Sequence, residues 1–333
     1  MGTKFGGEHY SKYKQKVQQN TLFEEIPSKE GNRKSFEQRF GELVNTKSNQ
    51  MEPKSIVLRK LSKFGEEVKN EISNQLKIEE IHMFGSYVKG TMTNSDDRKD
   101  VDLLFILDRR FHQNWLEQDM GTINALNRLR NILLKNPRYD RGKVSVNGNA
   151  VSIEIDNIKV DIVIGFRNLS ERGFLIPDTS NGGRWIKTDP RTSGRVLNIM
   201  DKKYNGQVKQ LVRLAKDWNE RNGKILKSYH IEATVIHYFR TIQPNSDQPL
   251  YANIDEYFFR LPEYVSSNNI RDPATEEKLS GYLDTKKRME LIRRALKTRD
   301  TIKRARKASS NSMYTDSLEY YRRVLYDNQE DKL

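Results

Sequence analysis

An apolar run that contains acidic residues constrains the fold of this chain more than any other segment. Residues 101–107 (VDLLFIL) favour β-structure and are bounded by clusters of aspartate and arginine, which is typical of a strand buried inside a sheet. Side chains alternate between the two faces of a strand, so Asp100 and Asp102 share one face and the apolar residues beside them lie on the other. The chain therefore needs a sheet that carries two carboxylates on one face.

The hydrophobic periodicity divides the chain into a mixed α and β part followed by a helical part. Ser55 can cap a helix, because apolar residues recur after it at the helical spacing as far as Leu76. We expect an α+β fold with an N-terminal arm (1–53), a core with a mixed sheet and flanking helices (54–197), and a helical lobe (198–333). Further helices are expected over 85–90, 115–134, 208–218, 228–239, 278–307 and 315–326, and strands over 78–84, 101–107, 151–155 and 158–164, the last two joined by a turn at Asp156 and Asn157.

The net charge and the lack of cysteine narrow the classes of function. The 333 residues carry a formal net charge of +14, which attracts nucleotides, nucleic acid or acidic headgroups. With no cysteine, the chain can form neither disulfides nor a thiolate nucleophile nor a cysteine-ligated zinc site. No stretch approaches the roughly 18 apolar residues of a membrane span. We expect a cytoplasmic protein with an anionic partner.

A third acidic residue, Asp161, lies in a second apolar strand of sequence KVDIVIGF. A charge between apolar neighbours is costly unless a partner compensates it. If this strand lies beside the first, Asp100, Asp102 and Asp161 converge and can hold two Mg²⁺ ions, or Mn²⁺, which would clamp the attacking and leaving oxygens of a displacement. The alternative is that Asp100 and Asp102 only end a strand and that Asp161 is half exposed.

A glycine-serine pair precedes these acids at the junction of an expected strand and helix. Gly85 lets a phosphate approach the backbone, and the first amides of the helix, together with the Ser86 hydroxyl, can donate to it. The turn is not a Walker loop, because no lysine follows its second glycine. Gly85 and Ser86 are therefore expected to bind a phosphate close to the carboxylates.

Together these motifs resemble the nucleotidyltransferase superfamily that includes the DNA polymerase β-like enzymes. Four further segments narrow the resemblance: LIPD at 175–178, WIKTDP at 185–190, LVRLAKDWN at 211–219 and LKSYHIE at 226–232. The series resembles the cGAS/DncV-like nucleotidyltransferases (CD-NTases), the oligonucleotide cyclases of bacterial antiphage (CBASS) signalling. It runs from about residue 56 to residue 239 and continues more loosely through the helical part.

The resemblance implies a polymerase β-like nucleotidyltransferase core and a helical C-terminal lobe, with the active site in the cleft between them. It implies a template-independent enzyme that builds a cyclic di- or trinucleotide from nucleoside triphosphates and releases pyrophosphate. A downstream effector would then meet this chain only through the product.

The family's functional positions carry over to eight residues of this sequence. Asp100, Asp102 and Asp161 would hold the two metal ions, and Gly85 with Ser86 would bind the donor triphosphate. From the helical lobe, Lys216 and Ser228 would reach the β- and γ-phosphates, and Tyr229 would stack on a base. A lysine charge and a hydroxyl at a helix start suit a triphosphate, and an aromatic face suits a nucleobase.

Two other classes of function stay open on the sequence. An RNA 3′-end nucleotidyltransferase of the poly(A) or CCA-adding type would use the same acids, and a catalytically silent relative would only bind nucleic acid. Residues 286–307, with eleven basic and two acidic residues, would contact RNA or another polyanion or would be the solvated face of a packed helix. Equally, Lys216 could be a surface lysine and Tyr229 a packing residue.

Overall fold

The computed structural model describes residues 29–50, 55–93, 99–140, 143–155, 158–179, 183–267 and 270–326. The first 28 residues of the predicted N-terminal arm and the predicted turn at Asp156 and Asn157 lie outside these ranges. Within them, no helix is long and apolar enough to cross a membrane.

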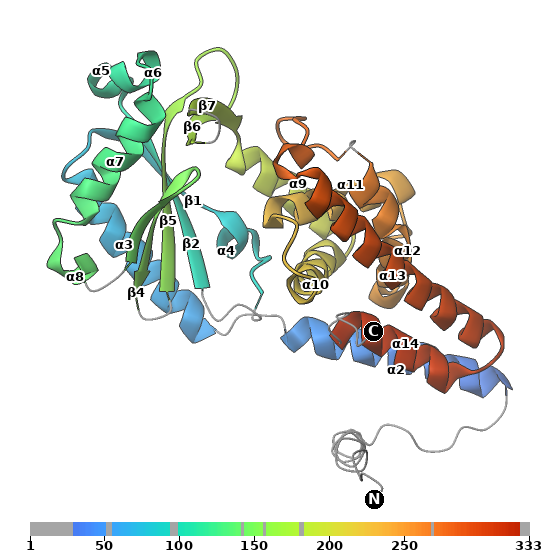
Figure 1. Cartoon of the computed structure of the whole chain (residues 1–333). Helices are drawn as coiled ribbons and strands as arrows, with labels where there is room; N and C mark the ends of the chain where they lie inside the picture. Colours follow the sequence, from blue (N-terminus) through green and yellow to red (C-terminus); the bar gives the residue numbers. More distant parts are fainter. Residues whose placement is uncertain are drawn as a thin grey trace, which may run out of the picture.

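Seven strands of the described chain form one mixed sheet (Figure 1). The main path runs in the order β1-β2-β5-β4-β3, in which β2 and β5 are parallel and the other neighbours antiparallel. A hairpin of β6 and β7 pairs with the far end of β5. The strands are β1 (Ile78–Phe84), β2 (Lys99–Leu107), β3 (Lys143–Asn147), β4 (Ala150–Ile155), β5 (Ile158–Arg167), β6 (Phe174–Asp178) and β7 (Arg184–Thr188).

The two faces of the sheet have different surroundings. Leu103 and Phe105 of β2 are fully buried against α3 (Ser55–Ser73) and α7 (Gly121–Leu133), which cover one face (Figure 1). Alternation turns Asp102 and Leu104 to the other face, where Leu104 packs with Phe174 of β6. The apolar core therefore lies on the helix-covered side, and the carboxylates lie on the side that faces away from α3 and α7.

The single helix predicted over 115–134 is wrong, because the segment forms α6 (Asn114–Glu117) and α7. Met120, between them, has a left-handed φ of 63°. A Cβ on Gly121 would overlap the carbonyl of Trp115, so the chain packs too tightly here for one continuous helix. The remaining short helices of this part are α4 (Gly85–Lys89), α5 (Arg109–His112) and α8 (Pro137–Asp140).

The second half of the chain is helical, as predicted. Its elements are α9 (Pro190–Lys203), α10 (Gln207–Arg221), α11 (Ser228–Ile242), α12 (Leu250–Ser266), the 3₁₀ helix η2 (Ser280–Tyr282), α13 (Thr285–Ser310) and α14 (Tyr314–Tyr326). The helix predicted from residue 278 starts at Thr285 instead, because the Asp284 side chain accepts from the amide of Lys287 at 2.7 Å and caps it. The predicted boundary between residues 197 and 198 falls inside α9.

The described part of the predicted N-terminal arm is helix α2 (Lys29–Gln50), and it packs in the helical lobe beside α14 (Figure 1). Phe36, Phe40 and Val44 belong to the buried core of that lobe. The Phe40 ring stacks on Tyr321 of α14 with a centroid distance of 3.9 Å. Helix α2 is therefore part of the helical lobe, although it precedes the sheet in the sequence.

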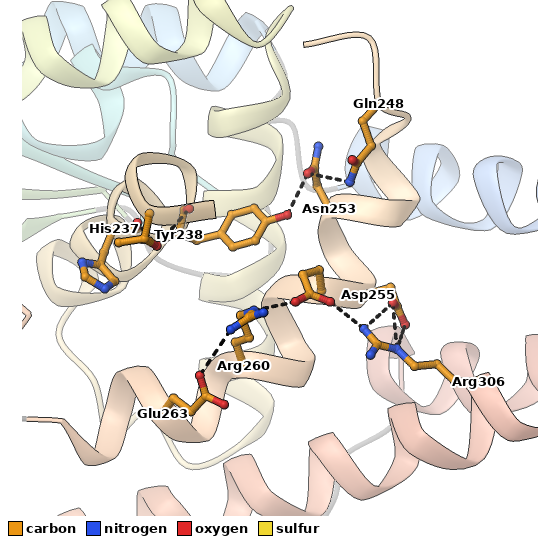
Figure 2. A network of polar contacts seen from close by, with 10 residues as sticks. His237, Tyr238, Gln248, Asn253, Asp255, Arg260, Glu263 and Arg306 are labelled. Atoms are coloured by element: carbon orange, nitrogen blue, oxygen red, sulfur yellow. Dashed lines mark hydrogen bonds and ion pairs between the residues drawn. The ribbon is translucent and has the colours of Figure 1, made fainter. Parts of the chain in front are cut away.

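A polar network ties α12 to its neighbours (Figure 2). The Tyr238 hydroxyl of α11 donates to Asn253 at 2.8 Å, and the Arg306 guanidinium of α13 donates to Asp255 at 2.7 Å and to Glu256 at 2.8 Å. Arg306, one residue of the basic run at 286–307, thus links α13 to α12. The predicted contact of that run with RNA or another polyanion stays a prediction.

Candidate active site

The pairing of β2 with β5 brings two of the predicted carboxylates together. The strands are parallel, and Asp102 is in register with Asp161. Both side chains therefore start from neighbouring positions on one face, on strands about 4.8 Å apart. Asp100 is in register with Lys159, two residues earlier on β5, and the Asp100 side chain lies outside the described set. The three predicted acids thus stand on two adjacent strands.

Gly85 begins α4 directly against this pair. Phe84, the last residue of β1, is in register with Asp102, so the turn after β1 passes over the Asp102 side chain. Gly85 has a left-handed φ of 78°, and a Cβ at this position would overlap the Asp102 carboxylate. Only glycine therefore lets the backbone lie so close to the carboxylate, and the predicted phosphate-binding turn and the predicted metal ligands share one place.

Both oxygens of the Asp161 carboxylate are engaged. Ser152 of β4 donates to Oδ1 at 2.5 Å, and the Lys159 ammonium donates to Oδ2 at 2.6 Å. Register explains both contacts, because Ser152 is opposite Asp161 and Lys159 is the next residue on the same face of β5. Lys159 therefore supplies positive charge beside the carboxylates.

The donor set fits a hard divalent cation. Carboxylate oxygens are the ligands that Mg²⁺ and Mn²⁺ prefer, and two carboxylates at neighbouring positions repel unless a cation lies near them. Among the described side chains, no group of three or more His, Cys, Asp or Glu residues is placed to hold a metal ion. Asp102 and Asp161 are the described members of the predicted set, and Asp100 would be the third.

On the helical lobe, Lys216 of α10 is buried and already bonded. Its ammonium group donates to Glu232 of α11 at 2.8 Å and to the Thr91 hydroxyl at 3.0 Å. Thr91 lies just beyond α4, so Lys216 spans from the helical lobe to the segment that carries Gly85 and Ser86. The predicted contact of Lys216 with the β- and γ-phosphates stays a prediction.

Ser228 and Tyr229 open helix α11, and both are exposed. The Tyr229 ring is 42% exposed and meets the Tyr282 ring edge-on at a centroid distance of 6.2 Å. Burial of the phenol and the charges of Asp272 and Asp178 raise the pKa of Tyr229 to about 12. Asp178 ends β6, so Tyr229 faces the sheet part of the molecule and presents an open ring beside it. Its predicted role in base stacking stays a prediction.

Five residues that contact the predicted ones or their partners were not predicted from the sequence: Ser152 and Lys159 beside Asp161, Thr91 and Glu232 beside Lys216, and Lys89, which donates to Glu232 at 2.8 Å. Strand alternation already placed Lys159 on the face of Asp161, and helical spacing placed Glu232 one turn after Ser228. Ser152 could have been found from the predicted turn at Asp156 and Asn157, because residues 152 and 161 are equally far from it. Lys89 needed the tertiary contact of α4 with α11, which no local pattern indicates.

Comparison with known proteins decides the family. The model of the Second Messenger Oligonucleotide or Dinucleotide Synthetase domain (SMODS) matches residues 34–198, a range that includes Gly85, Asp102 and Asp161. Residues 34–198 form a SMODS domain. The predicted resemblance to the CD-NTases is thereby confirmed. Enzymes of this family generally use divalent metal ions.

A curated relative matches part of the chain. A probable cyclic nucleotide synthase of Bacillus cereus (strain VD146) is 30% identical over 134 residues, which are 38% of this chain and 40% of that protein. The chain therefore matches less than half the length of this relative.

Solved structures show the same fold over nearly the whole molecule. CdnC of E. coli MS115-1 aligns with a TM-score of 0.66 at 14% identity, over 88% of this chain and 99% of that one. The cyclic AMP-GMP synthase DncV of Vibrio cholerae aligns with a TM-score of 0.56 at 13% identity, over 98% and 86%. The predicted fold class, a polymerase β-like nucleotidyltransferase core with a helical lobe, is confirmed.

Proposed function

We propose that this chain is a template-independent nucleotidyltransferase that joins nucleoside triphosphates into a cyclic di- or trinucleotide, with release of pyrophosphate. The observation that carries the proposal is the register of Asp102 with Asp161 beneath Gly85, because it joins a cation site to a phosphate-binding turn. The family match and the 30% identity to a probable cyclic nucleotide synthase support this product class over an RNA 3′-end enzyme. Its setting would be bacterial antiphage signalling in the cytoplasm.

Each predicted residue has a part in this reaction. Asp100, Asp102 and Asp161 would hold two Mg²⁺ ions, for which Mn²⁺ could substitute, and Ser152 and Lys159 orient the Asp161 carboxylate. When bound, the ions would neutralise charge on the triphosphate as a ribose hydroxyl attacks the α-phosphorus and pyrophosphate leaves. Gly85, Ser86, Lys216 and Ser228 would hold the triphosphate, and Tyr229 would stack on a base.

Ligands of the structural relatives support nucleoside triphosphates as substrates. CdnC was solved with ATP, and DncV was solved with the linear intermediate 5′ pppA(3′,5′)pG. An intact carboxylate pair in register argues against a chain that only binds nucleic acid, because such a chain has no use for two adjacent buried-strand acids.

Mass spectrometry of the products tests the proposal. The chain is incubated with all four NTPs and Mg²⁺ or Mn²⁺, with and without added RNA. We expect a phosphatase-resistant cyclic di- or trinucleotide whose mass also reports the bases used. RNA that grows by added nucleotides would instead establish the 3′-end enzyme, and unreacted NTPs in every condition would contradict the proposal.

A further inference from the structure

A buried cluster of charged residues joins the sheet part to the helical lobe. It consists of Lys89 at the end of α4, Thr91 just after it, Lys216 of α10 and Glu232 of α11. The side chains of Lys89, Lys216 and Glu232 are 13%, 8% and 8% exposed, and Thr91 is fully buried. We call these four residues the junction cluster.

Glu232 accepts from all three other members. Its Oε1 accepts from Lys216 at 2.8 Å and from the Thr91 hydroxyl at 2.9 Å, and its Oε2 accepts from Lys89 at 2.8 Å. Burial alone would raise the pKa of this carboxyl, but the charges of Lys216 and Lys89 lower it far below its ordinary value. The carboxylate therefore stays ionised and acts as the common acceptor of the cluster.

The cluster lies between the two predicted halves of the triphosphate site. On one side, α4 starts at Gly85 and Ser86 and ends at Lys89, and the following carbonyl of Gly90 accepts from Arg213 of α10 at 2.9 Å. On the other side, Glu232 lies one turn after Ser228 on α11. A rigid link of about one helical turn thus connects Glu232 to each group of phosphate-binding residues.

We propose that Glu232 is a positioning residue, which fixes the segment bearing Gly85 and Ser86 against the helical lobe so that both halves of the site keep one spacing. The inference rests on the proposed function. Without the carboxylate, the buried ammonium groups of Lys89 and Lys216 would face each other, and α4 would move away from α10 to separate them and would lose its link to α11. A displacement of this kind weakens triphosphate binding although no residue in contact with the substrate has changed.

Helix α10 offers a matched control in Asp217, the residue after Lys216. The Asp217 carboxylate is also buried between two cations, Lys47 of α2 at 3.2 Å and Arg221 of α10 at 2.8 Å. These partners belong to the helical lobe alone. Asp217→Asn therefore removes the same chemistry with a comparable loss of stability, but it leaves the contact of α4 with α11 intact.

The test compares Glu232→Gln with Asp217→Asn in the full chain. Three quantities are measured: urea unfolding, hydrogen exchange of residues 84–93, and steady-state kinetics with NTP. For Glu232→Gln we expect faster exchange of residues 84–93 and a KM for NTP raised about tenfold or more. For Asp217→Asn we expect lower stability, with exchange of 84–93 and KM within about twofold of the wild type.

If the two variants change hydrogen exchange and KM equally, the proposal is wrong, because a purely structural role of Glu232 predicts equal changes. If Glu232→Gln does not fold, Lys89→Met replaces it, since this change removes the contacts of α4 with Glu232 at 2.8 Å and with Ser193 of α9 at 3.0 Å and carries the same expectation. If the wild type makes no product, the proposed function fails, whereas hydrogen exchange still tests whether Glu232 holds residues 84–93.

Discussion

We call the face of the sheet that carries Asp102, Lys159 and Asp161 the sheet face. The sheet face and the junction cluster both contain carboxylates and ammonium groups, but in opposite proportion. On the sheet face, the Asp161 carboxylate accepts from the ammonium group of Lys159, and Asp102 is in register beside Asp161. In the junction cluster, the ammonium groups of Lys89 and Lys216 share one carboxylate. The groups named here leave negative charge in excess at the first place and positive charge in excess at the second. A cation suits the first place, whereas the ammonium groups of the second are already held by Glu232.

The sheet face and the junction cluster also differ in how far their carboxylates are exposed to solvent. Asp161 is partly exposed on an open face, so a ligand can reach it, whereas Glu232 is enclosed by its partners. A carboxylate that a ligand can reach can bind a cation, whereas a carboxylate enclosed by its partners cannot. We infer that the sheet face binds its counter-ion directly and that the junction cluster acts mainly by holding its surroundings in place.

Removing one carboxylate of the sheet face should have the largest effect. For Asp102→Asn we expect the rate of product formation to fall on the order of 10³-fold or more, because the metal loses a charged ligand. Circular dichroism and the melting temperature should stay close to the wild type. Glu79→Gln, an exposed acid of β1, is the control and should be fully active. A normal rate for Asp102→Asn would show that the sheet face is not the metal site.

Gly85→Ala tests whether the turn and the carboxylate must touch. The added Cβ overlaps the Asp102 carboxylate, so we expect a loss of activity of about 100-fold and a destabilisation of about 1–3 kcal/mol. Gly148→Ala is the matched control, because Gly148 also has a left-handed φ, 61°, but its Cβ would meet open space. If the two variants lose the same activity, backbone strain rather than contact with Asp102 explains the result.

Lys159→Met makes the charge imbalance of the sheet face larger. Without the ammonium group the carboxylates repel each other, so the metal-free protein should melt at a lower temperature than the wild type. Mn²⁺ should bind about tenfold more tightly, because a neighbouring positive charge is gone. Titration of the electron paramagnetic resonance signal of free Mn²⁺ measures this, with Lys187→Met of β7 as the control. Weaker Mn²⁺ binding would mean that Lys159 supports the metal site instead of opposing it.

The smallest predicted effect is a pH dependence of the free energy of unfolding that comes from His230 of α11, two residues before Glu232. Burial and the charge of Arg288 lower the pKa of His230 from 6.5 to about 4, so the folded protein keeps this imidazole neutral. The unfolded chain binds the extra proton first, and stability is therefore lost as the pH falls from 6.5 towards 4. Between pH 7.5 and 5.5 we expect a loss of about 1 kcal/mol in the free energy of unfolding.

Urea denaturation at these two pH values measures the change. Burial also lowers the pKa of His82, His112 and His237, so His230→Gln should remove only the share of His230, and an unchanged slope in that variant would assign the effect to the other histidines. Glu232 does not contribute in this window, because its lowered pKa keeps its own stabilising effect in place above about pH 4.5.

Local patterns predicted the elements that carry the carboxylates. Strand β1 has the predicted bounds of 78–84, and β2 and β5 were expected from apolar runs that only a buried strand tolerates. Alternation along those strands was enough to put Asp100 and Asp102 on one face. Their pairing with Asp161 required the assumption that the two strands are neighbours, which the structure confirms.

Elements held by tertiary contacts were missed. Strands β6 and β7 are short and depend on pairing with the end of β5, and α12 contains Pro262, which argues against a helix in a sequence pattern. The junction cluster shows the same limit. Lys89 and Glu232 are 143 residues apart in the chain, and each belongs to a helix whose local pattern is complete without the other.

We infer that a cation binds at the sheet face and that a triphosphate lies between this face and the helical lobe. A crystal structure with Mn²⁺ and a non-hydrolysable NTP analogue tests it most directly. We expect anomalous Mn²⁺ density at the carboxylates of Asp102 and Asp161, with the triphosphate in contact with Ser86. Mn²⁺ and nucleotide bound away from both residues would contradict it.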